Sequence, residues 1–177
     1  MAGSYFHINN YIVGKVDPVL LPMTIGANGI KVYESLKYAT IANSDLILEY
    51  RFPYKINWKG QVTYSYGRDF KNENLPFISP VRYVTSVNYF FKKFNVEFMV
   101  KGNLEQTTFN PAYGETRTAD WGTLNTSLSY SFDLGRTKLL AKAGVENILD
   151  AYYSTFSDWN NIPRMGRNVF VNLVYTF

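Results

Sequence analysis

Side chains that bind metals or act as nucleophiles are scarce in this chain and poorly spaced for chemistry. The sequence has no cysteine and one histidine, His7, so it has neither a disulfide framework nor a thiolate or multi-histidine metal site. His7 has no motif around it that suggests a Ser-His-Asp arrangement. Asp45 and Glu49 share one face of an extended segment, and a solvated face explains them better than a metal. We therefore predict no catalytic residue, no metal site and no cofactor, and a protein that is not an enzyme.

Phosphate and nucleic-acid recognition are also disfavoured. The glycines of GANG (26–29) and YGET (113–116) lack the strand–turn–helix context in which glycine loops cradle phosphate. The net charge is modest at +4, and no basic run of the nucleic-acid-binding kind is present. We expect no nucleic-acid partner.

The composition combines many aromatic rings with a polar average. Aromatic residues make up 18% of the 177 residues, including 15 Tyr and 13 Phe. The mean hydropathy is nevertheless −0.18. A transmembrane β-barrel has this combination, because it places aromatic girdles at both membrane interfaces and a polar face toward its lumen. No stretch approaches the length of an apolar transmembrane helix.

Alternation with a period of two recurs along most of the chain, and helical periodicity does not appear. Phe94 and Phe98, for example, alternate with Asn95 and Glu97. In the very long segment 31–52, Leu36 and Tyr38 are expected on the same face as the later apolar residues. The predicted strands are 4–13, 31–52, 57–67, 82–91, 94–102, 121–132, 137–147 and 166–177.

The connections between these strands alternate in length. Short ones are predicted at 53–56, 92–93 and 133–136, and long ones at 14–30, 68–80, 104–120 and 148–165. Short periplasmic turns and long extracellular loops are typical of an antiparallel up-and-down barrel in the outer membrane. We therefore predict an all-β fold, an antiparallel up-and-down transmembrane β-barrel with about eight strands in this chain.

The positions of aromatic and charged residues agree with this interpretation. A girdle is predicted beside the short turns, made by Phe52, Tyr54, Trp58, Phe90, Phe91, Phe94, Phe132 and Phe177. The opposite interface is predicted at Tyr64, Tyr66 and Trp121. Charged residues that alternate with apolar ones are expected to face a wet lumen or a plug. They are Glu49, Arg51, Glu97, Lys101, Lys142 and Glu146.

Two motifs in the last third of the sequence, GVENILDAYYSTF (144–156) and IPRMGRNVFVNLVYTF (162–177), resemble the C-terminal end of a TonB-dependent outer-membrane receptor. The first is similar to the penultimate strand and its Asn-Leu-Phe-Asp-x-x-Tyr motif, and the second is similar to the closing strand. The matching residues are Asn147, Ile148, Leu149, Asp150, Tyr153, Pro163, Gly166, Arg167 and Phe177. GETRTADWGTLNTSLSYSF (114–132) resembles the loop and strand before them.

Physical roles can be suggested for these motif residues. Asn147 and Asp150 are suited to ending a strand by bonding their own backbone. Gly166 allows a close backbone approach, and Arg167 is expected to pair with Asp150 or with loop carboxylates. Tyr175 and Phe177 lie on the outward row of the last strand. In the family, such a terminal aromatic strand is an address for the outer-membrane barrel assembly machinery.

The resemblance implies a fragment of a larger transporter. Members of the family close about 22 strands around a plug domain, which a TonB complex energises. Residues 1–177 would be a single C-terminal barrel segment without the plug. The parent receptor would take up a scarce ligand of the ferric siderophore, metal chelate, haem or cobalamin class. The segment would contact outer-membrane lipid in a Gram-negative bacterium, and its ligand-binding residues stay unknown.

Two other interpretations remain. Eight strands are enough to close a small barrel, so the chain is also compatible with a standalone eight-stranded outer-membrane barrel with an adhesin or structural role. A soluble β-sandwich binding module is the third interpretation, which the terminal aromatic strand and the segregated loop lengths disfavour. The N-terminus MAGSYFHINN does not read as a signal peptide.

Overall fold

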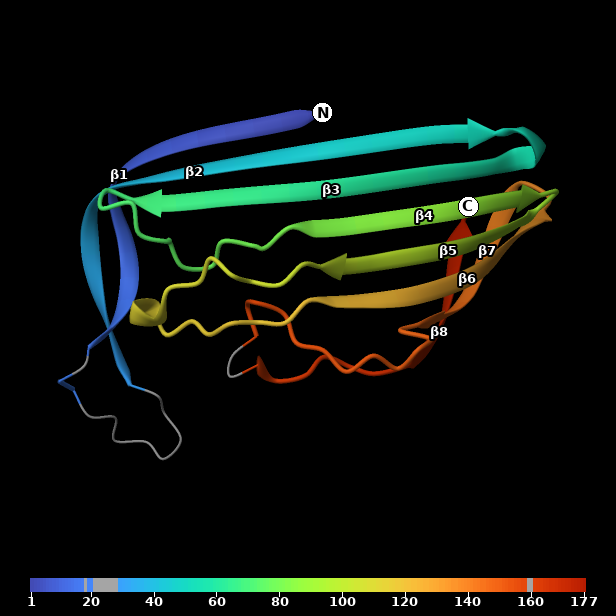
Figure 1. Cartoon of the computed structure of the whole chain (residues 1–177). Coiled ribbons are helices and arrows are strands. Elements are labelled where there is room, and N and C mark those ends of the chain that lie inside the picture. Colours follow the sequence, from blue (N-terminus) through green and yellow to red (C-terminus); the bar gives the residue numbers. More distant parts are fainter. Residues whose placement is uncertain (18, 21–28, 159–160) are drawn as a thin grey trace.

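The computed structural model describes residues 1–17, 19–20, 29–158 and 161–177. Eight strands form one antiparallel sheet, which confirms the predicted all-β, up-and-down class (Figure 1). The strands are β1 (Ala2–Asp17), β2 (Ile30–Phe52), β3 (Ile56–Asp69), β4 (Arg82–Phe91), β5 (Phe94–Asn103), β6 (Trp121–Leu134), β7 (Thr137–Glu146) and β8 (Asn168–Thr176). Two short 3₁₀ turns, η1 (Pro53–Lys55) and η2 (Pro111–Tyr113), lie in the connections that the structure describes in full. No helix in the described ranges is long and apolar enough to cross a membrane.

Each strand pairs with its neighbours in the chain, in the order β1 to β8. The sheet curls, so that β8 lies behind the front strands in Figure 1. Within the described part of the chain, no ladder joins β1 to β8. The eight strands therefore form an open curved sheet here, and not the self-closed barrel of the second interpretation.

The short and long connections segregate to opposite ends of the sheet. The β2–β3, β4–β5 and β6–β7 turns lie together at the right of Figure 1, and the longer loops lie at the left. The first connection is shorter than the predicted 14–30, because β1 continues to Asp17 and β2 begins at Ile30. Residues 18 and 21–28 of that predicted loop, which include most of GANG, lie outside the described residues.

The strict alternation of the strands produces one apolar face and one polar face. On the apolar face, exposed side chains of each strand lie beside exposed side chains of the next strand, from β2 to β8. They include Leu46, Val62, Val87, Phe98, Leu128 and Val171. The opposite parity carries Asp45, Gln61, Glu97, Lys101 and Lys142, which we call the polar face.

Aromatic rings gather on the apolar face near the tight turns. The ring centroids of Phe94 and Tyr130 are 4.5 Å apart, and those of Tyr130 and Phe132 are also 4.5 Å apart. Phe52 and Phe177 join similar pairs, with Tyr50 and Tyr175 respectively. The sequence also predicts Phe90 in this girdle, which is wrong, because Phe90 pairs with Asn95 and so belongs to the polar face.

The long strand β2 does not keep one alternation over its whole length. Leu36 and Ala39 both lie in the buried cluster, although an odd spacing should place them on opposite faces. The prediction that Leu36 shares a face with the later apolar residues of the strand, such as Leu46 and Leu48, is therefore wrong. Across the ladder, Asn10 of β1 has a φ of 53°, a left-handed conformation that changes the direction of the strand. The bend turns the β1–β2 hairpin toward the loops.

The compact core of the described residues lies at this bend and not inside the sheet. Val13 and Leu36 come from the bent hairpin, and Ala39 follows the bend. Leu75 from the β3–β4 loop and Tyr113 from η2 pack against them. Two long loops are thus anchored to the hairpin by apolar burial, which holds them over one end of the sheet.

Candidate functional site

The β3–β4 and β5–β6 loops are joined to each other by side-chain amides. Asn74 Nδ2 donates to the carbonyl of Phe109 at 3.2 Å, and Asn110 Nδ2 donates to the carbonyl of Asn74 at 3.2 Å. The Glu115 carboxylate accepts from the backbone N–H of Phe77 at 2.7 Å and of Asn110 at 3.1 Å. Because each bond crosses from one loop to the other or closes a turn, the two loops form one unit, which we call the loop cap.

Gln106 fastens the loop cap at its base. Its backbone N–H donates to the carbonyl of Thr118 at 2.9 Å, and its side-chain Nε2 donates to the carbonyl of Ile78 at 2.7 Å. The residue is only 2% exposed. These bonds satisfy backbone groups that loops usually leave to water. The sequence did not reveal this role, because a glutamine in a polar loop carries no distinctive pattern.

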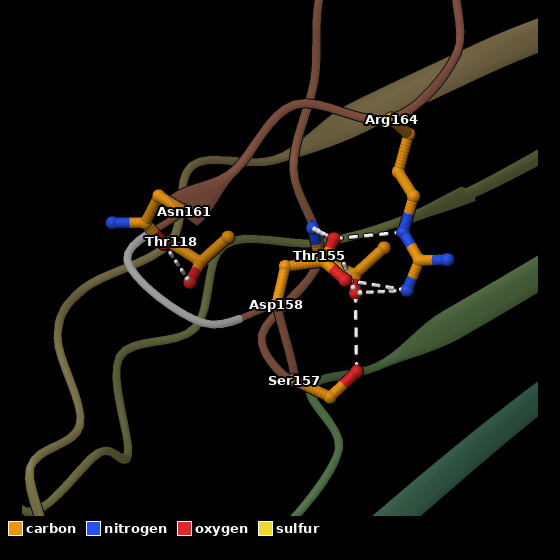
Figure 2. Close-up of polar contacts among 6 residues, drawn as sticks. All are labelled: Thr118, Thr155, Ser157, Asp158, Asn161 and Arg164. Carbon is orange, nitrogen blue, oxygen red and sulfur yellow. Dashed lines mark hydrogen bonds and ion pairs between the residues drawn. The ribbon is translucent and has the colours of Figure 1, made fainter.

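The β7–β8 loop has its own polar centre at Asp158 (Figure 2). The Asp158 carboxylate accepts from the backbone N–H of Thr155 at 2.7 Å, from Thr155 Oγ1 at 3.0 Å and from Arg164 Nε at 2.8 Å. Nearby, Thr118 Oγ1 donates to Asn161 Oδ1 at 3.5 Å, which links this loop to the loop cap. The sequence shows the residue types but not that they meet.

The pKa of Asp158 responds to this environment. Burial acts to raise the pKa of Asp158, but the bonds from Arg164 and from Thr155 outweigh burial and hold the pKa below its usual range. A carboxyl with a depressed pKa stabilises the folded loop above its ordinary pKa near 4 and loses that contribution as pH falls through the lowered value.

We therefore expect Asp158→Asn to loosen the β7–β8 loop at neutral pH, because an amide cannot match the charge of Arg164. Amide hydrogen exchange at Thr155 should be faster in this variant than in the wild-type protein. Acidification below pH 4 should lower the protection factor of Thr155 in the wild-type protein, taken relative to the intrinsic exchange rate at each pH, toward that of the variant, whose own protection factor should change little. Equal Thr155 exchange in both proteins at neutral pH would contradict this role.

Four of the motif residues meet at one corner of the sheet. Asn147 is buried and closes a turn: its Oδ1 accepts from the backbone N–H of Ala151 at 2.9 Å, and its Nδ2 donates to the carbonyl of Ala151 at 2.9 Å. Asp150 Oδ1 accepts from the backbone N–H of Arg167 at 2.7 Å. A Cβ on Gly166 would collide with Asp150 Oδ1, so any larger residue there would displace the Asp150 carboxylate from the N–H of Arg167.

The contact between Arg167 and Asp150 differs from the ion pair that the sequence suggested. The backbone of Arg167 binds Asp150, while the guanidinium Nε donates to the carbonyl of Ile148 at 2.9 Å. Both Asn147 and Asp150 have positive φ angles, 50° and 55°. The loop backbone turns at these two residues. The guanidinium of Arg167 can therefore reach the carbonyl of Ile148, which lies between them.

Tyr153 and Trp121 form the aromatic part of the site. Their rings stack at a centroid distance of 4.3 Å and an interplanar angle of 25°. Burial raises the pKa of Tyr153. The sequence predicts Trp121 at the membrane interface opposite the short turns, but Trp121 pairs with Asn103 and so lies on the polar face. The β7–β8 loop covers that face and supplies Tyr153.

Tyr175 and Phe177 lie apart from this corner. Tyr175 is on the apolar face of β8, where it pairs with Leu139, and Phe177 follows the end of the strand. Both side chains are exposed. Of the predicted site residues, the structure thus brings Asn147, Asp150, Gly166 and Arg167 together and leaves the two terminal aromatics at the opposite end.

The polar face is hollowed by two cavities, and a third lies among the loops. A cavity of about 440 Å³ is bounded by β3–β6 and the β7–β8 loop, and another of about 410 Å³ lies nearer the tight turns. The third, of about 630 Å³, lies between the bent hairpin and the loops, with Phe77, Tyr113 and Phe156 in its lining. These sizes suit small molecules.

The charges near the tight turns are largely paired. Lys59 Nζ lies 2.9 Å from Glu49 Oε1, and Lys142 Nζ lies 3.3 Å from Glu97 Oε2. Among the described residues, no three His, Asp or Glu side chains come close enough to hold a metal ion. The cavities and paired charges of the polar face are suited to holding a polar solute.

A two-faced, up-and-down curved sheet with long loops at one end is the architecture of a β-barrel wall. The chain is similar to a solved structure named copper transporter OprC, with a TM-score of 0.82 and 16% sequence identity over 98% of this chain. The match spans 28% of that structure's chain. At this identity the likeness defines the fold. No protein-family model matches the sequence, and no curated protein matches it.

Proposed function

We propose that this chain forms part of the wall of an outer-membrane transport barrel in a Gram-negative bacterium. The observation that carries the proposal is the exposed apolar face, which extends from β2 to β8 beside a polar face with cavities and ion pairs. An apolar surface of this extent is unfavourable in water and stable against lipid hydrocarbon. The likeness to a transporter barrel supports a transport role and not an enzymatic one.

The finer proposal is a TonB-dependent receptor. The motif residues of 144–177 support it, since four of them hold one corner of the sheet together. Under this proposal residues 1–177 are a C-terminal barrel segment, and the plug and remaining strands belong to the rest of the receptor. The barrel assembly machinery and the TonB complex would be its partners. A ferric siderophore, another metal chelate, haem or cobalamin would be the ligand.

Fractionation and gel mobility test the barrel directly. The protein that contains this chain should be recovered in the outer-membrane fraction and should migrate faster on a denaturing gel before boiling than after it. Recovery in soluble form without detergent would overturn the proposal. If the barrel is present, uptake of a labelled ligand that stops when TonB is deleted would establish the finer proposal.

A further inference from the structure

The cavity of about 440 Å³ is lined by two cations without a carboxylate partner in the described part of the chain, while the Asp45 carboxylate is engaged by Thr63 and Gln61 of the same lining. Arg82 of β4 and Lys101 of β5 both line it. Arg82 pairs with Asn103 and Lys101 pairs with Val84, so the two cations are diagonal neighbours on the polar face. Among its lining residues in the described ranges there is no carboxylate.

These two cations differ from the lysines nearer the tight turns. Lys59 and Lys142 have carboxylate partners in Glu49 and Glu97. Neither Arg82 nor Lys101 forms an ion pair within the described ranges. Arg164 also lines the cavity, but Asp158 matches its charge. Neighbouring like charges repel each other, and an anion between them would remove that cost.

A second observation points to a missing hydrogen-bond acceptor in the same wall. The indole N–H of Trp121, which lines the cavity, is buried and has no acceptor in the described part of the chain. A buried donor without a partner is costly, and such groups are rare in folded proteins. The ring of Trp121 stacks on that of Tyr153. The nitrogen is closed to water in this conformation, so a ligand oxygen becomes its partner only if the Trp121 ring shifts.

We propose that this cavity binds a small organic oxyanion through Arg82 and Lys101. The planar guanidinium of Arg82 can bind a carboxylate or phosphate through two parallel hydrogen bonds, and the ammonium of Lys101 adds a second positive charge. The stacked Trp121 and Tyr153 rings form one wall for the carbon skeleton of the ligand. The inference rests on the proposed barrel, because the cavity faces a lumen only if the sheet is part of one.

Titration with citrate, in parallel with inorganic phosphate, tests the site in the detergent-purified protein. We expect saturable citrate binding by calorimetry, with a change in tryptophan fluorescence. The double variant Arg82→Gln/Lys101→Gln should weaken binding by at least tenfold. The matched variant Lys92→Gln/Arg136→Gln removes the same charge from the tight turns and should bind as the wild-type protein does. Competition by phosphate would identify a general oxyanion site, and its failure a carboxylate site.

Heat-dependent gel mobility, measured on every variant, separates loss of binding from loss of folding. If Arg82→Gln/Lys101→Gln does not assemble, Trp121→Phe locates the site: calorimetric binding should remain within a few fold while the fluorescence response disappears. Absence of saturable binding in an assembled wild-type barrel would overturn the inference and leave the proposed function standing. Equal citrate affinity in the two double variants would also overturn it. Failure of the wild-type protein to form a barrel would instead count against the proposed function.

Discussion

Replacing Phe98 with arginine should prevent the protein from accumulating as a folded barrel. Phe98 lies in the middle of β5 on the apolar face, is 54% exposed, and pairs with Val87 and Thr126. An arginine on the lipid face near the bilayer midplane costs about 2–4 kcal/mol. Outer-membrane yield and the fraction that shows heat-dependent gel mobility should both fall by at least tenfold.

The adjacent residue supplies the matched control. Met99 follows Phe98 in the strand but lines a cavity on the polar face. Met99→Arg therefore introduces the same charge at nearly the same position in the chain, but its guanidinium would reach the lumen of the proposed barrel. We expect this variant to assemble normally. Similar yields for the two variants would contradict the assignment of faces, and with it the membrane proposal.

Replacing Leu75 with alanine should release the loop cap from the bent hairpin. Leu75 is fully buried and is held among Val13, Leu36 and Tyr113. Truncating a buried leucine costs about 2–5 kcal/mol, through lost burial and the cavity left behind. The strands from β3 to β8 contribute no residue to this cluster. The expected result is an assembled barrel whose β3–β4 and β5–β6 loops are cut at least tenfold faster by protease.

A leucine outside the cluster is the control for that experiment. Leu104 begins the β5–β6 loop and is 52% exposed, so Leu104→Ala removes the same atoms without opening a cavity. Its backbone N–H still donates to the carbonyl of Val81. We expect its cleavage rate to match that of the wild-type protein. Slow cleavage of the Leu75→Ala loops would show that the polar bonds between Asn74, Asn110 and Glu115 hold the cap without the apolar anchor.

The strands could be predicted from the sequence because alternation is a local property. In β5, Phe94 and Phe98 mark one face and Asn95 and Glu97 the other, and no distant contact is needed to see it. The same reasoning fails where the backbone departs from an extended conformation. The left-handed Asn10 and the loss of alternation between Leu36 and Ala39 depend on loops that dock there from elsewhere in the chain.

For the residues of the site, too, the sequence predicted some features and only the structure revealed others. The motif marked Asn147, Asp150, Gly166 and Arg167, and the structure gathers them at one corner. Which atoms meet could not be predicted, because backbone and guanidinium compete for the same acceptors. Gln106 and Asp158 carried no signal, since their partners come from separate loops or from a turn without regular spacing.

The sequence by itself determined the fold class, an all-β, up-and-down sheet. Its marks are eight alternating strands, short turns at one end, long loops at the other, and aromatic rings beside the turns. Alternation and turn length are encoded by residues close together in the chain. Only the tertiary structure decided that no ladder joins β1 to β8 in the described residues, that Trp121 lies on the polar face, and that Arg82 and Lys101 share a cavity. Curvature, strand register and loop docking set these features, because each depends on residues far apart in the chain.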